Sequence, residues 1–331
     1  MPKRVMKTEI LRVLRNSMDY VSGQELCNGL SVSRTAVWKV MNQLKDEGYV
    51  IGSVQNKGYR IIAYPDVMTA DEIMSRLKAE TFVDRIFSFD EVDSTNLKAR
   101  FLAEEGAPQG TVVIADKQTH GRGRRGRSWE TAGKTSIAMS IVLRPNILPT
   151  HAAMLTLIMG MSVVEACNQV LHVEAQIKWP NDIVLNKRKF CGILTEMSAE
   201  IDYINYIVVG TGINVNMDSF PEEIVDKATS LKIETGQSVL RSELSASVLE
   251  CFEVNYKSFL EVQDLSFMLE KYNESLVNFG KNVRVLDPNG EYTGTSIGIN
   301  NSGELIVKKE DGTIEFVYSG EVSVCGLYGY V

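Results

Sequence analysis

The part of this chain best suited to chemistry is a loop rich in glycine and arginine. Residues 118–129 read Gln-Thr-His-Gly-Arg-Gly-Arg-Arg-Gly-Arg-Ser-Trp and contain four arginines and three glycines. Guanidinium groups stay charged and present forked donors that match phosphate and carboxylate oxygens. Glycine lets a backbone come close to a ligand. The composition predicts a loop that closes over an anionic small molecule, and a solvated basic loop is the alternative.

The residue spacing of two nucleotide-binding motifs occurs in this region, but the flanking residues do not fit either motif. Gly121, Gly123 and Gly126 have the dinucleotide-binding spacing, but no apolar helix follows them and residues 140–147 hold no carboxylate. Gly133-Lys-Thr resembles the end of a P-loop, but Ser128 stands where its first glycine is needed. We therefore expect neither motif here.

Three further polar clusters stand at the ends of predicted elements. Residues 93–96 (Asp-Ser-Thr-Asn) open a helix, with Ser94 as its N-cap, and a helix N-terminus also binds polar ligands. Residues 178–182 (Lys-Trp-Pro-Asn-Asp) join a cation, a ring, an amide and a carboxylate, with a structural turn as the alternative. Residues 210–214 (Gly-Thr-Gly-Ile-Asn) end a strand with a permissive backbone and one amide.

The elements that hold these clusters alternate along residues 65–277. A helix capped by Thr69 begins the region, and an apolar helix covers roughly residues 150–171. This order predicts an α+β domain whose mixed sheet is covered on one face by helices. The expected strands are residues 111–115, 136–143, 183–185, 190–197 and 204–210.

Residues 1–64 have the pattern of a winged helix-turn-helix. Ser22 and Ser33 cap the second and third helices, and Asn56-Lys57-Gly58 is the turn of a hairpin. The segment carries ten Lys or Arg and five Asp or Glu, a net charge of +5, whereas the whole chain carries −7. This charge favours DNA over a protein partner, and a homodimer on a palindromic operator is expected. The predicted DNA-binding residues are Ser33, Arg34, Thr35, Trp38, Lys39, Lys57 and Arg60.

Residues 278–331 have a different pattern. Apolar residues alternate with polar ones around Val283, Ile297, Leu305 and Ile314, and turn signals lie between them. This spacing predicts a small SH3-like β-barrel.

Bulk composition is that of a cytoplasmic protein. Five scattered cysteines without a C-x-x-C pair argue against disulfides and zinc, and three histidines argue against a histidine metal site. We expect no apolar run near the 18 residues of a membrane span, no signal peptide and no membrane partner.

Taken in order, the motifs resemble those of the biotin–protein ligase family. Residues 93–96, 121–129, 178–182, 188–196 and 210–215 all match, and the winged helix is similar to that of bifunctional ligases that also repress biotin synthesis genes. Lipoate ligases share the catalytic fold but lack the arginine loop, so they are a distant alternative.

The resemblance implies substrates and roles. The substrates are biotin and ATP with Mg²⁺, and biotinyl-5'-AMP is both the intermediate and the corepressor. The partners are a biotin carboxyl carrier protein, operator DNA and, with adenylate bound, a second copy of the chain. The implied biotin-binding residues are Ser94, Thr95, Asn96, Gln118, Arg122, Gly123, Arg124, Lys189 and Gly192. The implied nucleotide-binding residues are Arg122, Arg124, Arg127, Trp129, Lys178, Asn181, Asp182 and Asn214.

Three residues carry the implied chemistry. Lys189 meets the reacting carboxylate, Arg124 assists it, and Asp182 is the metal-binding residue through MgATP. No nucleophilic serine or cysteine with a histidine partner is visible in the sequence, so we expect no covalent enzyme intermediate, and positioning and charge neutralisation would dominate. The alternative class is a non-catalytic transcription factor that senses a small molecule and needs neither Lys189 nor Asp182.

Overall fold

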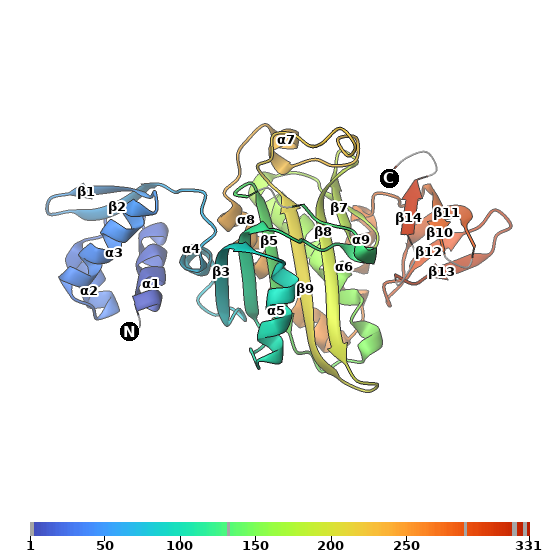
Figure 1. Ribbon diagram of the computed structural model, residues 1–331, viewed down its shortest axis with the longest axis horizontal. Coiled ribbons are helices and arrows are strands. Elements are labelled where there is room, and N and C mark those ends of the chain that lie inside the picture. The colour runs from blue at the N-terminus through green and yellow to red at the C-terminus, as the bar shows by residue number, and fades with distance from the viewer. Residues whose placement is uncertain (1–2, 131–132, 288–289, 320–322, 327–329) are drawn as a thin grey trace. The chain divides into compact units, whose positions relative to one another are not determined.

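The computed structural model describes residues 3–130, 133–287, 290–319, 323–326 and 330–331 (Figure 1). The chain forms two compact units. One contains Met1–Glu80 and Leu240–Ala246, and the other contains Thr81–Val239 and Ser247–Val331.

The first unit is the expected winged helix-turn-helix with one added helix. The Ser22 hydroxyl accepts from the Glu25 amide and the Ser33 hydroxyl accepts from the Ala36 amide, so both predicted caps are confirmed. The Asn56-Lys57-Gly58 turn joins two antiparallel strands, as expected. The elements are α1 (Lys3–Asn16), α2 (Gly23–Leu30), α3 (Arg34–Asp46), β1 (Val50–Val54), β2 (Gly58–Ala63) and α4 (Ala70–Arg76).

Several cations that the charge count assigned to this unit are not available to DNA. Lys7 is buried and pairs with Glu47 and Asp71, while Arg15 pairs with the buried Glu72. Net charge therefore overstated the number of free cations, because a sum over the sequence does not distinguish buried pairs from exposed groups.

The second unit is built on a seven-stranded mixed sheet in the order β3-β4-β5-β9-β8-β7-β6. β3 and β4 are parallel, and the other neighbours are antiparallel. All five predicted strands are present, and β3 and β6 are additional. The bounds are β3 (Arg85–Val92), β4 (Thr111–Gln118), β5 (Ser136–Leu143), β6 (Gln176–Lys178), β7 (Asp182–Leu185), β8 (Arg188–Ala199) and β9 (Ile204–Asn214).

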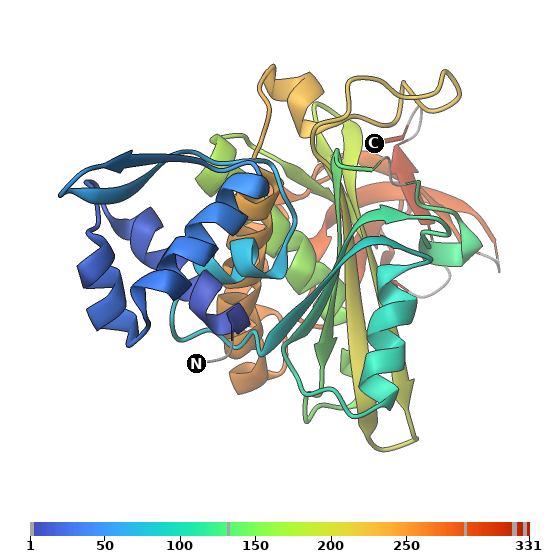
Figure 2. The same cartoon turned by 60° about the vertical axis from the view of Figure 1, so that its left-hand side comes forward.

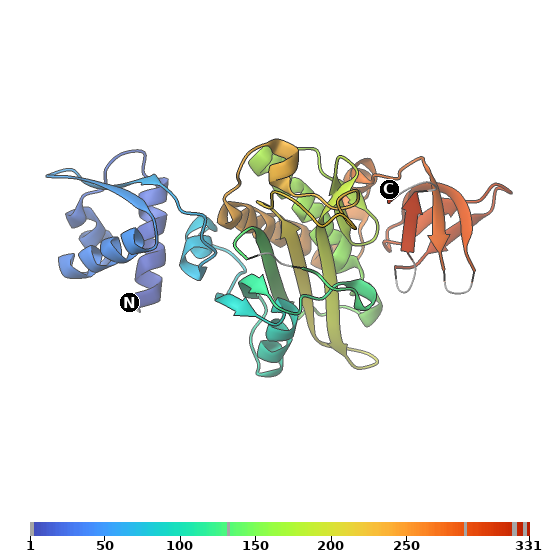
Figure 3. The same cartoon turned by 45° about the horizontal axis from the view of Figure 1, so that its top comes forward.

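Helices cover both faces of this sheet. α5 (Thr95–Glu104) packs on β4, β5 and β9, and α6 (Met154–Leu171) packs on β6 to β9 (Figures 2 and 3). Coverage of only one face, as the sequence suggested, is therefore wrong. The remaining helices are α7 (Leu231–Thr235), α8 (Arg241–Val262), α9 (Leu269–Ser275) and the 3-10 turns η1 (Arg124–Gly126), η2 (Pro149–His151) and η3 (Ser266–Met268).

The expectation that no segment is long and apolar enough to cross a membrane is also wrong. The helix Pro149–Leu171 meets that criterion by length and composition, with a mean hydropathy of 1.5, but 67% of the window is buried inside the protein. Its packing on four strands identifies it as a core helix of the sheet domain.

The end of the chain forms a five-stranded antiparallel sheet in the order β13-β12-β11-β10-β14. Its first four strands were predicted, and β14 was not. Ile314 and Phe316 are exposed rather than inward-facing, because the alternate residues of β13, Glu315 and the buried Val317, face the other side. The predicted turn at residues 288–290 lies partly outside the described residues. The bounds are β10 (Asn282–Leu286), β11 (Tyr292–Ile299), β12 (Leu305–Lys308), β13 (Ile314–Val317) and β14 (Ser323–Gly326).

Candidate functional site

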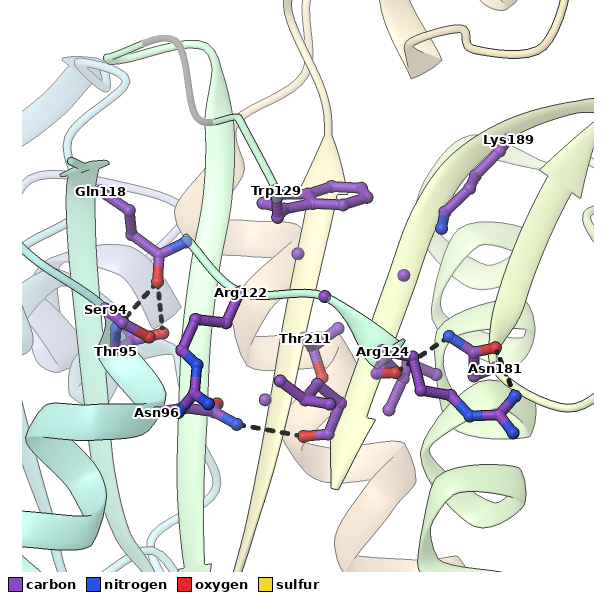
Figure 4. Close-up of a pocket in the computed structure, with 16 residues that line it drawn as sticks. Ser94, Thr95, Asn96, Gln118, Arg122, Arg124, Trp129, Asn181, Lys189 and Thr211 are labelled. Atoms are coloured by element: carbon purple, nitrogen blue, oxygen red, sulfur yellow. Dashed lines mark hydrogen bonds between the residues drawn. The ribbon is translucent and has the colours of Figure 1, made fainter. Parts of the chain in front are cut away.

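A pocket of about 450 Å³, its open mouth included, lies where the arginine loop meets α5, β8 and β9 (Figure 4). All nine implied biotin-binding residues line it. Further lining residues are Trp129, Asn181, Ile193, Leu194, Gly210, Thr211 and Gly212.

The floor of this first pocket is held by a hydrogen-bond chain. The Gln118 carbonyl oxygen accepts from the Thr95 amide at 2.8 Å and from the Thr95 hydroxyl at 3.1 Å. The buried Ser140 hydroxyl lies 2.8 Å from the Thr95 hydroxyl oxygen and 2.7 Å from the Asn96 carbonyl oxygen, so these two acceptors share its one proton. These bonds fix which end of the Gln118 amide is donor and which is acceptor, as recognition of a polar ring requires.

Ser94 and Asn96 contribute in ways that the sequence did not specify. Ser94 occupies the N-cap of α5, but its side chain makes no cap bond to the helix, which differs from the expectation. The Asn96 amide donates to the Leu194 carbonyl and to Glu196, and its oxygen accepts from Ser140. Asn96 is therefore already engaged by the protein and holds the pocket wall in place.

Two glycines make room for the Trp129 ring. A Cβ atom on Gly212 would meet Trp129 ring atoms at 2.5 Å, and one on Gly192 would meet the same ring at 3.0 Å. The ring can lie across β8 and β9 only because these positions have no side chain. Gly212 of the Gly-Thr-Gly motif at 210–212 therefore leaves space for an aromatic side chain that lies more than 80 residues earlier in the chain.

Two buried polar atoms of this pocket have no hydrogen-bond partner among the described residues. They are the indole nitrogen of Trp129 and the hydroxyl of Thr211. Buried polar groups in proteins are nearly always bonded, so these two atoms indicate that a polar ligand belongs here. Sequence reasoning passed over Thr211, although it lies inside a motif that was noted.

A second, strongly basic pocket adjoins the first. Among the described residues, its one lining carboxylate is Asp182, which pairs with the Lys189 ammonium at 2.6 Å. Burial alone would raise the pKa of Asp182, but Lys189 and Lys178 hold it below its usual value. Such a cluster of cations suits phosphate groups. The charged residues that line it are Arg124, Arg125, Arg127, Lys178, Asp182, Lys189 and Lys227.

Arg124 connects the two pockets. Its guanidinium donates to Asn181 and to the carbonyl of Ser319, which follows β13, and burial lowers its pKa while Asp182 opposes this. Arg122, by contrast, lines only the first pocket and pairs with Glu196 at 3.1 Å. The η1 turn and a bridge between Arg122 and Ser128 fold the loop back on itself, so no long helix follows the glycines as a dinucleotide motif requires. The strand β5, not a helix, follows Gly133-Lys-Thr, so a P-loop is not formed there either.

A third pocket is mainly apolar and shares Trp129 and Lys189 with the basic one. Part of this pocket is lined by the segment that follows Asn214. That segment is held beside β8, because the Lys189 backbone exchanges hydrogen bonds with Lys227 and Thr229. Of its lining residues, sequence reasoning identified Trp129, Lys189 and Asn214 only. The apolar residues that it missed are Met217, Phe220, Pro221, Ile224 and Ala228.

The predicted DNA-binding residues of the first unit lie at its surface. Ser33, Arg34, Thr35, Trp38 and Lys39 are exposed at the start and along one side of α3. The wing residues Lys57 and Arg60 are also exposed.

Comparison with known proteins places the chain. The Biotin/lipoate A/B protein ligase family matches residues 88–214, an HTH domain matches 7–60, and the biotin protein ligase C terminal domain matches 279–324. The bifunctional ligase/repressor BirA of Bacillus spizizenii is 38% identical over 310 residues, or 92% of this chain and 94% of that protein. The chain belongs to the family of bifunctional biotin ligase/repressors. The Escherichia coli BirA is 29% identical over 327 residues, or 98% of either chain.

Solved structures agree with this assignment. The biotin protein ligase from Aquifex aeolicus in complex with biotin and ATP matches with a TM-score of 0.65 and 33% identity, over 73% of this chain and 98% of that one. As a family member the chain is an enzyme, so the alternative of a sensor without catalytic activity is set aside. The lipoate ligase alternative is set aside because the similarity to the bifunctional ligase/repressor covers 92% of the chain, and residues 279–324 match the biotin protein ligase C terminal domain.

Proposed function

We propose that the three pockets hold the three parts of one reaction complex. Biotin lies in the first pocket, the phosphates of ATP in the basic pocket and the adenine ring in the apolar pocket. The observation that supports this most directly is that Lys189 and Trp129 line all three. A biotin carboxylate beside Lys189 would then face the α-phosphate of ATP.

The reaction has two steps. A biotin carboxylate oxygen attacks the α-phosphorus of ATP, which forms biotinyl-5'-AMP and releases pyrophosphate. A lysine amine of the carrier protein then attacks the anhydride carbonyl, forms an amide and releases AMP. Lys189 and Arg124 offset negative charge on the carboxylate and phosphate, and the loop keeps water away from the anhydride.

Asp182 fits a metal ion only in part. Both of its oxygens are engaged, one by Lys189 and the other by Tyr330. No group of three metal-ligating side chains exists among the residues that the structure describes. Asp182 would therefore contact Mg²⁺ that arrives with ATP, and the described residues would provide no further ligand set.

The test of the ligase assignment is incubation with biotin, MgATP and a biotin carrier domain. AMP release and biotin on the acceptor are expected. Lys189→Ala should slow adenylate formation about 10²- to 10³-fold, the usual effect of losing one preorganised electrostatic contact. A mutant with wild-type single-turnover rates would remove Lys189 from the mechanism.

We further propose that the first unit binds operator DNA through α3 and the wing, and that the protein acts in the cytoplasm. The described cysteines are all free, which fits a reducing compartment. Arg34→Ala combined with Lys39→Ala should abolish operator binding and leave ligation intact. An unchanged mobility shift would refute this DNA-binding face.

A further inference from the structure

Tyr330, the penultimate residue of the chain, contacts two charged side chains of the basic pocket. Its hydroxyl donates to one Asp182 oxygen, whose other oxygen pairs with Lys189. Its ring lies under the Lys178 ammonium, 4.2 Å from the ring centre. Neither composition nor any motif of the sequence pointed to this tyrosine.

The two contacts restrain groups that would otherwise have freedom in the pocket. Lys178 is 7% exposed, so its ammonium has lost most of its water, and an aromatic face is a favourable partner for such a cation. The Tyr330 hydroxyl is protonated at neutral pH and can donate, and burial raises its pKa further. A donor on Asp182 fixes the carboxylate beside Lys189.

The position of the ring adds a second argument. Tyr330 lines both the basic pocket and the apolar pocket, as do Ser128, Trp129, Lys189 and Lys227. A nucleotide that spans the two pockets must pass this shared boundary. Tyr330 does not line the first pocket, where biotin is placed.

We propose that Tyr330 is a positioning residue for the nucleotide: it orients Lys178 and Asp182 toward the phosphates of ATP and has no part in binding biotin. This inference rests on the placement of ATP proposed above. It assigns to the end of the chain a role in the first half-reaction only.

The experiment measures binding of the α,β-methylene analogue of ATP with Mg²⁺, and separately of biotin, to the full chain. Tyr330→Ala should raise the dissociation constant of the analogue about tenfold, which corresponds to about 1.4 kcal/mol of binding free energy. Tyr330→Phe keeps the ring under Lys178 and removes only the hydroxyl, so its affinity for the analogue should fall by less, about threefold. In steady state the KM for ATP should rise, whereas transfer from preformed biotinyl-AMP to the acceptor should keep its rate.

Tyr292→Ala is the matched control. It removes a tyrosine ring of the C-terminal sheet that also lies against a lysine, with Lys309 at 4.5 Å. Tyr292 lines none of the three pockets. The proposal is overturned if Tyr330→Ala binds the analogue as wild type does, binds it more tightly, loses biotin affinity equally, or behaves like Tyr292→Ala. If wild type itself binds no analogue, the ATP placement fails instead.

Discussion

Thr211 shows at the scale of one residue how an unsatisfied polar group marks a ligand. Its hydroxyl is buried in the first pocket without a partner among the described residues. Thr211→Val removes the hydroxyl and keeps the shape. Biotin affinity should fall about three- to tenfold, the net value of one hydrogen bond. The ligand-free protein should melt at the same or a higher temperature, because a desolvated, unbonded group is lost.

Thr211→Ser is the control for this variant and should retain biotin affinity. Equal biotin dissociation constants for wild type and Thr211→Val would show that the hydroxyl does not contact biotin. The sequence could not have identified this residue, because Thr211 differs from any other strand threonine only in the partners that it lacks.

Most site residues were predictable from sequence because they lie in local clusters. Residues 93–96 and 118–129 reach the same pocket from adjacent parallel strands, and each is recognisable by itself. Tyr330 was not predictable, because its partner Asp182 lies 148 positions away and nothing local indicates the pairing.

At the scale of elements, the crossing of Trp129 over β8 and β9 can be tested directly. Gly212→Ala would place a Cβ atom 2.5 Å from the indole ring, so the ring must move. Overpacking of this kind costs about 1–3 kcal/mol, and we expect slower adenylate formation and faster loss of biotinyl-AMP. Rapid quench measures adenylate formation, and filter binding measures the loss of biotinyl-AMP.

Gly133→Ala is the matched substitution. It precedes β5, and its Cβ would meet Lys117 at 3.8 Å, an ordinary contact. Loss of activity in both variants would mean that glycine flexibility matters rather than the space for Trp129.

Strands were predicted well where apolar runs are bounded by polar residues. Ser136–Leu143 is buried throughout and was predicted to the residue. Arg85–Val92 was missed because only one of its eight residues is fully buried, and its parallel pairing with β4 is not a local feature. Gln176–Lys178 is too short to produce a periodic signal.

Glu72 joins four segments of the first unit. It is completely buried and accepts from Arg15, Arg76 and Tyr49, and from Ser242 at the start of α8. Breaking a buried ion pair costs about 3–5 kcal/mol, so Glu72→Gln should speed amide hydrogen exchange in α1 and α4. Exchange in β5 should stay as in wild type.

The pH dependence of this effect follows from the pKa of Glu72. Burial raises it, but Arg15 and Arg76 outweigh burial and lower it overall. A lowered pKa means that the carboxylate stabilises the fold above the unfolded-state pKa, about 4.3, and that this stability is lost as the pH falls through the lower folded-state pKa. Wild type and Glu72→Gln should therefore differ at pH 7 and converge in acid. A constant difference would argue that packing, not charge, is responsible.

At the scale of the whole molecule, charge separates the two functions. The DNA-binding segment is basic, although the chain carries −7. DNA should therefore approach through the first unit alone, and affinity should fall steeply with salt because each phosphate contact releases counterions. One winged helix contacts a short site, so two copies are needed for tight and specific repression.

Biotinyl-AMP should promote that pairing. Arg125 and Arg127 of the loop have no ion-pair partner among the described residues, so without an anion the loop carries mutually repelling charges. The adenylate phosphate would neutralise them and order the loop, which lowers the entropy cost of pairing two copies. Sedimentation with and without biotinyl-AMP measures the monomer–dimer constant.

The Arg34→Ala, Lys39→Ala double variant should dimerise normally and still fail to bind operator DNA. If the monomer–dimer constant is the same with and without biotinyl-AMP, this route to repression is ruled out, whereas the ligase chemistry is unaffected.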